Sequence, residues 1–130
     1  MTKKVLLFAC AILTLAPAAT ASADISWDGM DRLCNGRDIA TGARVASGAA
    51  ADQFILCQTI LRTAVQTHDL LRDLWHVPPA IRVPDGISTR TATLMFAAWL
   101  QVRTRRYADD GTGSAGFIAL MFLTETWPAL

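Results

Sequence analysis

The chain has 130 residues, a length that favours a single domain. Both lysines, Lys3 and Lys4, lie in the first 23 residues, and the rest of the chain carries ten arginines against eleven acidic residues, a net charge of −1. This balance argues against the basic face on which non-specific nucleic-acid binding depends. About half of the residues are apolar, which argues against a disordered chain.

Residues 1–23 have the pattern of a bacterial secretory signal peptide. Two lysines precede an apolar run at 5–15, and small residues ending in Ala21-Ser22-Ala23 follow it. The run is too short to span a bilayer, which takes roughly 20 residues. We therefore expect cleavage after Ala23, or two residues earlier, and a mature domain at 24–130 in the periplasm. The alternative, a lipoprotein signal at Cys10, would leave almost no apolar region before the cysteine.

Two cysteines, Cys34 and Cys57, remain after this cleavage. An even pair in a small exported domain indicates a disulfide bond. The alternatives are a catalytic thiol, which is normally single, and a metal site, which needs three or four ligands. Closing a loop of about 24 residues would stabilise the fold by about 3 kcal/mol.

The first two predicted helices follow the signal peptide. Trp27, Met30 and Leu33 recur at helical spacing between residues 25 and 33, and Asn35-Gly36 ends this segment. Residues 36–49 lack periodicity and are expected to form a loop. A long helix is predicted from about Ala50 to Trp75, with Ser47 as its N-cap. One apolar stripe is expected to face the core, formed by Phe54, Cys57, Leu61, Ala64, Val65, Leu71 and Trp75.

Pro78-Pro79 ends the long helix, and residues 76–87 form a turn-rich connector. Ser88 is expected to cap a third helix that runs to about Tyr107. The side chains expected to face inward on this helix are Leu94, Met95, Ala98, Trp99 and Val102. The four arginines expected to face water are Arg90, Arg103, Arg105 and Arg106.

A loop at 109–113 precedes a last helix from Ala115 to about Thr126, which Ser114 caps and Pro128 stops. No segment of useful length alternates like a strand. The sequence therefore predicts an all-α fold, a small bundle of about four helices stapled by one disulfide.

Two segments, Leu94–Leu100 and Phe117–Leu123, are apolar on every side. A helix that is apolar all round requires burial all round, and a domain of this size hardly encloses two such helices. Two interpretations remain: the surplus forms a subunit or partner interface, or the two helices pack on each other at the centre.

Candidate catalytic residues are few. His68 and His76 are the two histidines, and Glu125 is the one glutamate. His68 follows the inward stripe and suits a half-buried structural role, whereas His76 suits the C-terminus of a helix, where its positive charge is favourable. Asp109-Asp110 lacks the alternating ligands of a calcium loop. The sequence predicts no catalytic, cofactor-binding or metal site, and therefore no enzyme.

The order of these signals resembles the Rap1a/Tai family of periplasmic immunity proteins over the whole mature chain. A signal peptide, a short helix ending in Cys34 and a helix carrying Cys57 come first. The connector then carries Val83-Pro84-Asp85-Gly86-Ile87-Ser88, the strongest match, and the chain closes on Trp127-Pro128. Many members of the family have two further cysteines, at positions that here hold Arg82 and Ala129, so this chain is a divergent member that lacks a second disulfide.

The resemblance implies a small all-α protein, commonly a homodimer, that binds and inhibits a peptidoglycan amidase delivered by a type VI secretion system. Its expected partner is thus a cell-wall amidase. As interface residues we expect four from the helix end and the connector: Trp75, His76, Arg82 and Asp85. For Asp85 the alternative is a mere turn former. The competing hypotheses are a periplasmic accessory or envelope-stress binding protein and a hydrolase with an unrecognised site.

Overall fold

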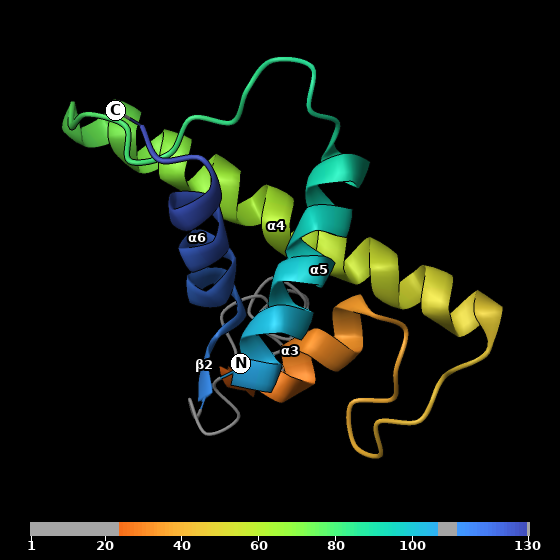
Figure 1. The fold of residues 1–130 in the computed structure, drawn as a ribbon. Helices are drawn as coiled ribbons and strands as arrows, with labels where there is room; N and C mark the ends of the chain where they lie inside the picture. Colours follow the sequence, from red (N-terminus) through yellow and green to blue (C-terminus); the bar gives the residue numbers. More distant parts are fainter. Residues whose placement is uncertain (1–23, 107–111, 130) are drawn as a thin grey trace, which may run out of the picture.

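The computed structural model describes residues 24–106 and 112–129 (Figure 1). Its elements follow the order β1 (Asp24–Ser26), α3 (Trp27–Cys34), α4 (Ser47–Trp75), α5 (Thr89–Arg106), β2 (Thr112–Ser114) and α6 (Ala115–Thr126). The predicted all-α class is confirmed, with four helices in the described ranges and one two-stranded sheet. The predicted signal peptide and the pair Asp109-Asp110 lie outside the described residues.

Serine side chains cap the starts of three helices. Ser26 Oγ accepts from the backbone N–H of Gly29 at 2.8 Å, Ser88 Oγ from Thr91 at 3.0 Å and Ser114 Oγ from Phe117 at 3.1 Å. Each bond satisfies an amide that the first helical turn leaves without a partner. The caps predicted at Ser88 and Ser114 are thereby confirmed.

The cap predicted for α4 is wrong. Ala46 occupies the N-cap position without a side-chain hydrogen bond, and Ser47 is already the first helical residue. The preceding loop is closed on itself by a backbone hydrogen bond from Val45 N to Gly36 O at 3.1 Å. The backbone bond from Ala50 N to Ala46 O at 2.9 Å opens the helix at Ala46, one position before the predicted cap.

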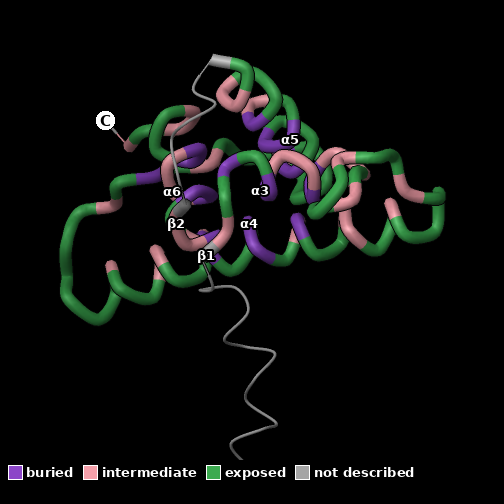
Figure 2. The backbone as a smooth tube through the Cα atoms, turned by 90° about the horizontal axis from the view of Figure 1, so that it is seen from below, coloured by how far each residue is buried: buried purple, intermediate pink, exposed green. Residues whose placement is uncertain are grey.

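Helix α4 is the spine of the molecule. Its 29 residues extend over about 43 Å at 1.5 Å per residue. The other helices pack against the middle of α4, so that both of its ends project beyond them (Figures 1 and 2). The residues of α4 that reach the core are therefore confined to its central turns: Cys57, Ile60, Leu61 and Ala64.

The predicted disulfide is present. Cys34, the last residue of α3, is bonded to Cys57 in the middle of α4, with the two Cα atoms 5.4 Å apart. Both cysteines are buried. The bond fastens the short first helix to the spine.

The two all-apolar segments meet at the centre of the domain. The ring centroids of Phe96 and Phe122 lie 5.1 Å apart, and those of Trp99 and Phe122 lie 5.7 Å apart. One face of α6 is buried, since Ile118, Ala119, Phe122 and Leu123 face the core while Phe117 remains exposed. Central packing thus accounts for this face of α6, and most of the remaining exposed apolar side chains lie on α4 and α5.

The inward face predicted for α5 is wrong. Leu94, Met95, Ala98 and Val102 are exposed and Trp99 is half-buried, whereas the buried residues are Ala92, Thr93, Phe96, Ala97 and Leu100. A helix with apolar residues on two faces gives no periodic signal to choose between them. Thr93 tolerates burial because its hydroxyl donates to the Thr89 carbonyl oxygen at 2.7 Å.

Arg103 also departs from the prediction that it faces water. Its guanidinium lies over the rings of Trp27 and Trp99, at 4.7 Å and 5.2 Å from their centroids, and Nη1 lies 3.4 Å from Glu125 Oε1. The indole of Trp99 donates to the same carboxylate at 3.0 Å. This cluster ties α3, α5 and α6 together.

Short extended segments close the fold at two places that the sequence did not predict. β1 pairs antiparallel with β2, with Ile25 opposite Gly113. Near the C-terminus, Arg82 N donates to Trp127 O at 2.9 Å and Ala129 N to Ala80 O at 3.1 Å, which joins the end of the chain to the connector. Across the described residues, no helix is long and apolar enough to cross a membrane.

Candidate partner-binding surface

The C-terminal end of α4 carries an exposed apolar cluster, which we call the α4 tip and which consists of Leu70, Leu71, Leu74, Trp75 and Val77. Leu74 is 61% exposed and Trp75 is 69% exposed. The prediction that Leu71 and Trp75 face the core is wrong because the stripe continues beyond the elements that cover it. Isolated apolar residues are common on surfaces, but a contiguous group of this kind is typical of an interaction site.

Helix α4 ends as the sequence predicted, at Trp75 before Pro78-Pro79. His76 forms the C-cap in the left-handed conformation, with φ 51°, and its side chain is exposed. A residue other than glycine is uncommon in this region. The cap turns the chain back sharply, so that Trp75 and His76 stand at the extreme end of the spine.

His68 holds the returning connector against α4. Its Nε2 accepts from the backbone N–H of Ala80 at 3.0 Å, and Nδ1 lies 3.0 Å from Asp69 Oδ1. Since Nε2 accepts, Nδ1 carries the proton and donates to the carboxylate. The His68 side chain is 12% exposed. This arrangement matches the structural role expected for His68.

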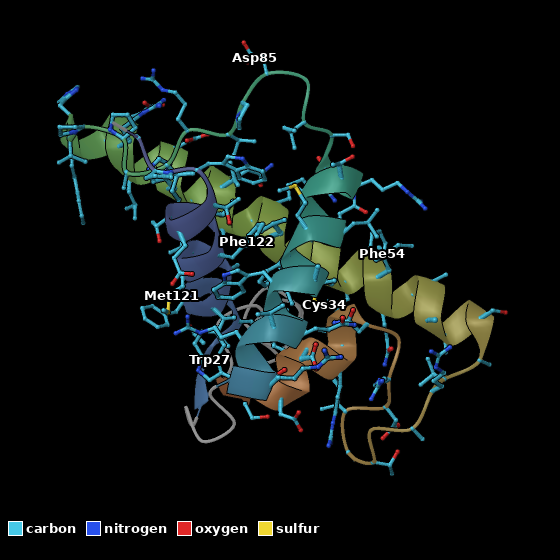
Figure 3. All side chains as sticks on the ribbon, viewed as in Figure 1. Trp27, Cys34, Phe54, Asp85, Met121 and Phe122 are labelled. Atoms are coloured by element: carbon cyan, nitrogen blue, oxygen red, sulfur yellow. A yellow bond between two sulfur atoms is a disulfide. The ribbon has the colours of Figure 1, made fainter. Side chains whose placement is uncertain are left out.

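The Val83–Ser88 motif forms a tight turn followed by a helix cap. Ile87 N donates to Pro84 O at 3.3 Å, and Gly86 has φ +88°, a conformation that glycine adopts without strain. Asp85 is exposed at the outer edge of the connector, away from the α4 tip (Figure 3). Val83 and Ile87 are half-buried against the bundle.

Three hollows follow one another along α4, and we call them together the furrow. The first, of about 530 Å³, is lined by Ala51, Phe54, Ile55, Gln58 and Arg90. The second, of about 160 Å³, is lined by residues of α4, the connector, α5 and the C-terminal part of the chain: Leu61, Arg62, Val65, Gln66, Val83, Ile87, Ser88, Thr89, Ala92, Leu123 and Trp127. The third, of about 240 Å³, is lined by Val65, His68, Asp69, Arg72, Pro79, Ile81, Arg82 and Val83.

Basic side chains accompany the furrow. Arg62, Arg82 and Arg90 each line one hollow and are exposed. Within the described part of the chain none of the three forms an ion pair; Arg90 lies 5.8 Å from the centroid of the Phe54 ring. Asp69 contributes a carboxylate to the furrow, and it already accepts from His68. The electrostatic character of the furrow is therefore basic.

The structure brings together only some of the four interface residues expected from the sequence. Trp75 and His76 are neighbours at the α4 tip, Arg82 lies in the third hollow, and Asp85 stands apart. Sequence reasoning missed Leu70, Leu74 and Arg62. The spacing of Leu70 and Leu74, four residues apart, would have indicated a second apolar face on α4.

A separate polar cleft lies between α3 and α5. Its lining includes Asp28, Asp31, Asn35, Gln101 and Thr104. Burial raises the pKa of Asp31, an effect that hydrogen bonds from Asn35 and Thr104 oppose and the nearby charge of Asp28 reinforces. The Thr104 hydroxyl lies 3.4 Å from Asp31 Oδ2 and 2.9 Å from the Leu100 carbonyl oxygen of its own helix. Among the described residues, no three of the types His, Cys, Asp and Glu are grouped so as to hold a metal ion.

Comparison of the chain with protein-family models, with curated proteins and with solved structures finds no match.

Proposed function

We propose that this chain is a periplasmic immunity protein that binds a peptidoglycan amidase of a type VI secretion system and blocks its active site. The observation that carries the proposal is the α4 tip, an exposed apolar cluster ending in Trp75 on a helix that projects from a stapled bundle. Tryptophan is among the residues that contribute most to binding energy at protein interfaces. The ordered motifs that resemble the Rap1a/Tai family, from Cys34 to Trp127-Pro128, point to the same class of protein.

Inhibition of this kind needs no chemistry from the inhibitor. An amidase that cleaves its substrate in an open groove is blocked by any complementary protrusion that excludes the substrate. The α4 tip supplies the protrusion, and the hydrogen bond from the Ala80 N–H to His68 holds the connector against α4 beside it. A rigid protrusion loses little conformational entropy on binding, which favours affinity.

The experiment uses a cysteine amidase encoded beside this chain. Expression of the amidase in the periplasm should lyse cells, and co-expression of the full chain should prevent lysis. Protection at low copy number requires nanomolar affinity, which corresponds to about 12 kcal/mol. Unchanged lysis, together with no complex on a sizing column, would reject the proposal and favour the accessory binding protein.

The α4 tip can be tested with a matched pair of variants. Trp75→Ala should weaken the complex about thirtyfold or more, because a central aromatic residue of an interface contributes 2 kcal/mol or more. Phe117→Ala removes another exposed aromatic side chain, from α6, and should leave the affinity unchanged. Equal affinities of the two variants would place the contact elsewhere.

We also propose that the chain is a homodimer, as the resemblance implies. Leu94, Met95 and Val102 form an exposed apolar face on α5 that is separate from the α4 tip. A symmetric pair that buries such a face is the commonest oligomer. Light scattering at tens of micromolar should give about twice the mass of the mature chain, and a monomer would reject the dimer without affecting the inhibitor proposal.

A further inference from the structure

We propose that the second hollow of the furrow is an anchor pocket, which takes one aromatic or branched aliphatic side chain that the partner protein presents next to a carboxylate. The inference rests on the proposed function, because it names how the inhibited enzyme is held. The α4 tip and the anchor pocket would then be two contacts on the same partner.

The size of the hollow determines the class of its occupant. Its volume is about 160 Å³, close to the roughly 150 Å³ cavities that bind benzene. Sites for drug-sized ligands begin at about 300 Å³. The hollow therefore accommodates one side chain of the size of leucine or phenylalanine.

The walls are mainly apolar, although Gln66, Ser88 and Thr89 also line them, and they come from α4, the connector, α5, α6 and Trp127. Leu61 and Val65 belong to α4, Val83 and Ile87 to the connector and Ala92 to α5. Leu123 of α6 and Trp127 close the remaining side. Val83 and Ile87, the two aliphatic residues of the Val83–Ser88 motif, thus line the pocket. The motif therefore forms part of the pocket wall in addition to forming the turn.

The pocket is held open by hydrogen bonds that do not involve an occupant. The Ile87–Pro84 turn fixes one end of the connector wall, and the bond from Arg82 N to Trp127 O fixes the other. The bond from Ala80 N to His68 holds the preceding segment to α4. A preformed pocket does not have to be ordered at the moment of binding, which favours affinity.

The rim indicates the charge of the occupant. Arg62 lines the pocket, is exposed and forms no ion pair within the described ranges, and the neighbouring hollows contribute Arg82 and Arg90. The carboxylate of Asp69 already accepts from His68. A partner segment that carries an acidic group beside its apolar side chain therefore complements both the pocket and its rim.

The first test needs no amidase. N-acetyl-phenylalanine combines a phenyl ring with a carboxylate, and N-acetyl-phenylalaninamide lacks the charge. In titrations followed by amide NMR shifts, both should give saturable shifts at Val65, Val83, Ile87 and Ala92. The acid should bind about two- to fivefold more tightly, the size of an exposed ion pair. Absence of saturable shifts at these residues would overturn the proposal.

Two matched pairs of variants locate the binding. Ala92→Leu fills the pocket and should abolish the shifts, whereas Ala98→Leu adds the same side chain to the exposed face of α5 and should not. Arg62→Glu should reverse the preference so that the amide binds better, and Arg44→Glu, in the loop before α4, should not. If Ala92→Leu retains the shifts, the pocket is not the site.

The same variants separate this inference from the proposed function. Ala92→Leu should weaken the amidase complex at least tenfold without changing the oligomeric state in light scattering. Full affinity in Ala92→Leu would overturn the anchor pocket and leave the inhibitor function standing. Loss of the dimer in Ala92→Leu would identify a second copy as the occupant, which also overturns it. If the wild type binds no amidase, the proposed function fails, and the probe titration alone decides whether the pocket binds.

Discussion

Leu61 and Trp75 lie fourteen residues apart on α4, about four turns, and so point to nearly the same side of the helix. Leu61 is 2% exposed, whereas Trp75 is 69% exposed. The exposure differs between the two ends of this apolar stripe because α6, with 12 residues, covers only part of α4, which has 29. Helical periodicity therefore identifies a face, but the length of the covering helices determines how much of the face becomes core.

The largest expected effect contrasts the two regions directly. Leu61→Ala should lower the free energy of unfolding by about 2–5 kcal/mol, because it removes a fully buried side chain and leaves a cavity. Leu74→Ala, the same change on the exposed tip, should change it by no more than about 0.5 kcal/mol. Urea unfolding followed by circular dichroism measures both. A large cost at Leu74 would mean that the tip is covered in the folded protein.

The disulfide joins α3 to the buried central part of α4, not to the exposed α4 tip. Cys57→Ala should cost about 3 kcal/mol, because the bond closes a loop of about 24 residues in the unfolded chain. Wild-type protein in a reducing agent should show a similar loss in urea unfolding. Mass spectrometry of the non-reduced protein should find no free thiol at Cys34 and Cys57, and two free thiols would contradict the argument.

His68 lies at the boundary between the two regions. His68→Ala should lower the free energy of unfolding by about 1–2 kcal/mol, since the Ala80 N–H loses its acceptor. Asp69→Asn is the matched control, because its side-chain oxygen can still accept from Nδ1, and it should cost less. Inhibition of the amidase by folded His68→Ala should persist, since no base is required; its loss would assign His68 a further role.

The smallest expected effects depend on pH and have opposite signs. Burial raises the pKa of Asp31, so the folded chain binds this proton more tightly than the unfolded chain, and stability falls as the pH rises from the ordinary pKa of 3.8 through the raised pKa. Hydrogen bonds from the Thr41 N–H and hydroxyl lower the pKa of Asp38, so its contribution is present above 3.8 and is lost as the pH falls through the lowered pKa.

Asparagine variants at these two positions separate the contributions. Above the titration range, Asp31→Asn should be more stable than wild type and Asp38→Asn less stable, and both differences should shrink toward acid pH. Thermal unfolding at a series of pH values measures this. Differences of the same sign in both variants would contradict the assignment.

Local signals in the sequence were sufficient for much of the fold. Ser88 and Ser114 cap helices and Pro78-Pro79 follows the end of α4, because each of these signals acts through its nearest neighbours. The bond between Cys34 and Cys57 spans 23 residues, and the even number of cysteines predicted it. The strands β1 and β2 could not be predicted, since three residues show no alternation and Ile25 meets Gly113 only after the chain has folded.

The candidate surface was predicted less completely. Trp75 and His76 were expected as interface residues and both are exposed, but the helical stripe had also placed Trp75 in the core, which was wrong. The furrow was not expected, because its second hollow combines Leu61, Val83 and Leu123 from three elements. The inward face of α5 was wrong for a related reason: two apolar faces compete, and only the packing of Phe96 against Phe122 selects one.

The join between Ala129 and Ala80 has a practical consequence for every binding experiment proposed above. It brings the C-terminus against the connector, next to Ile81 and Arg82, which line the third hollow of the furrow. An affinity handle fused at the C-terminus would therefore start beside the furrow and compete with a partner for it. The loop between α3 and α4 lies at the end of the spine opposite the α4 tip (Figure 1), so a peptide epitope inserted after Thr41 reports on the complex without obstructing it.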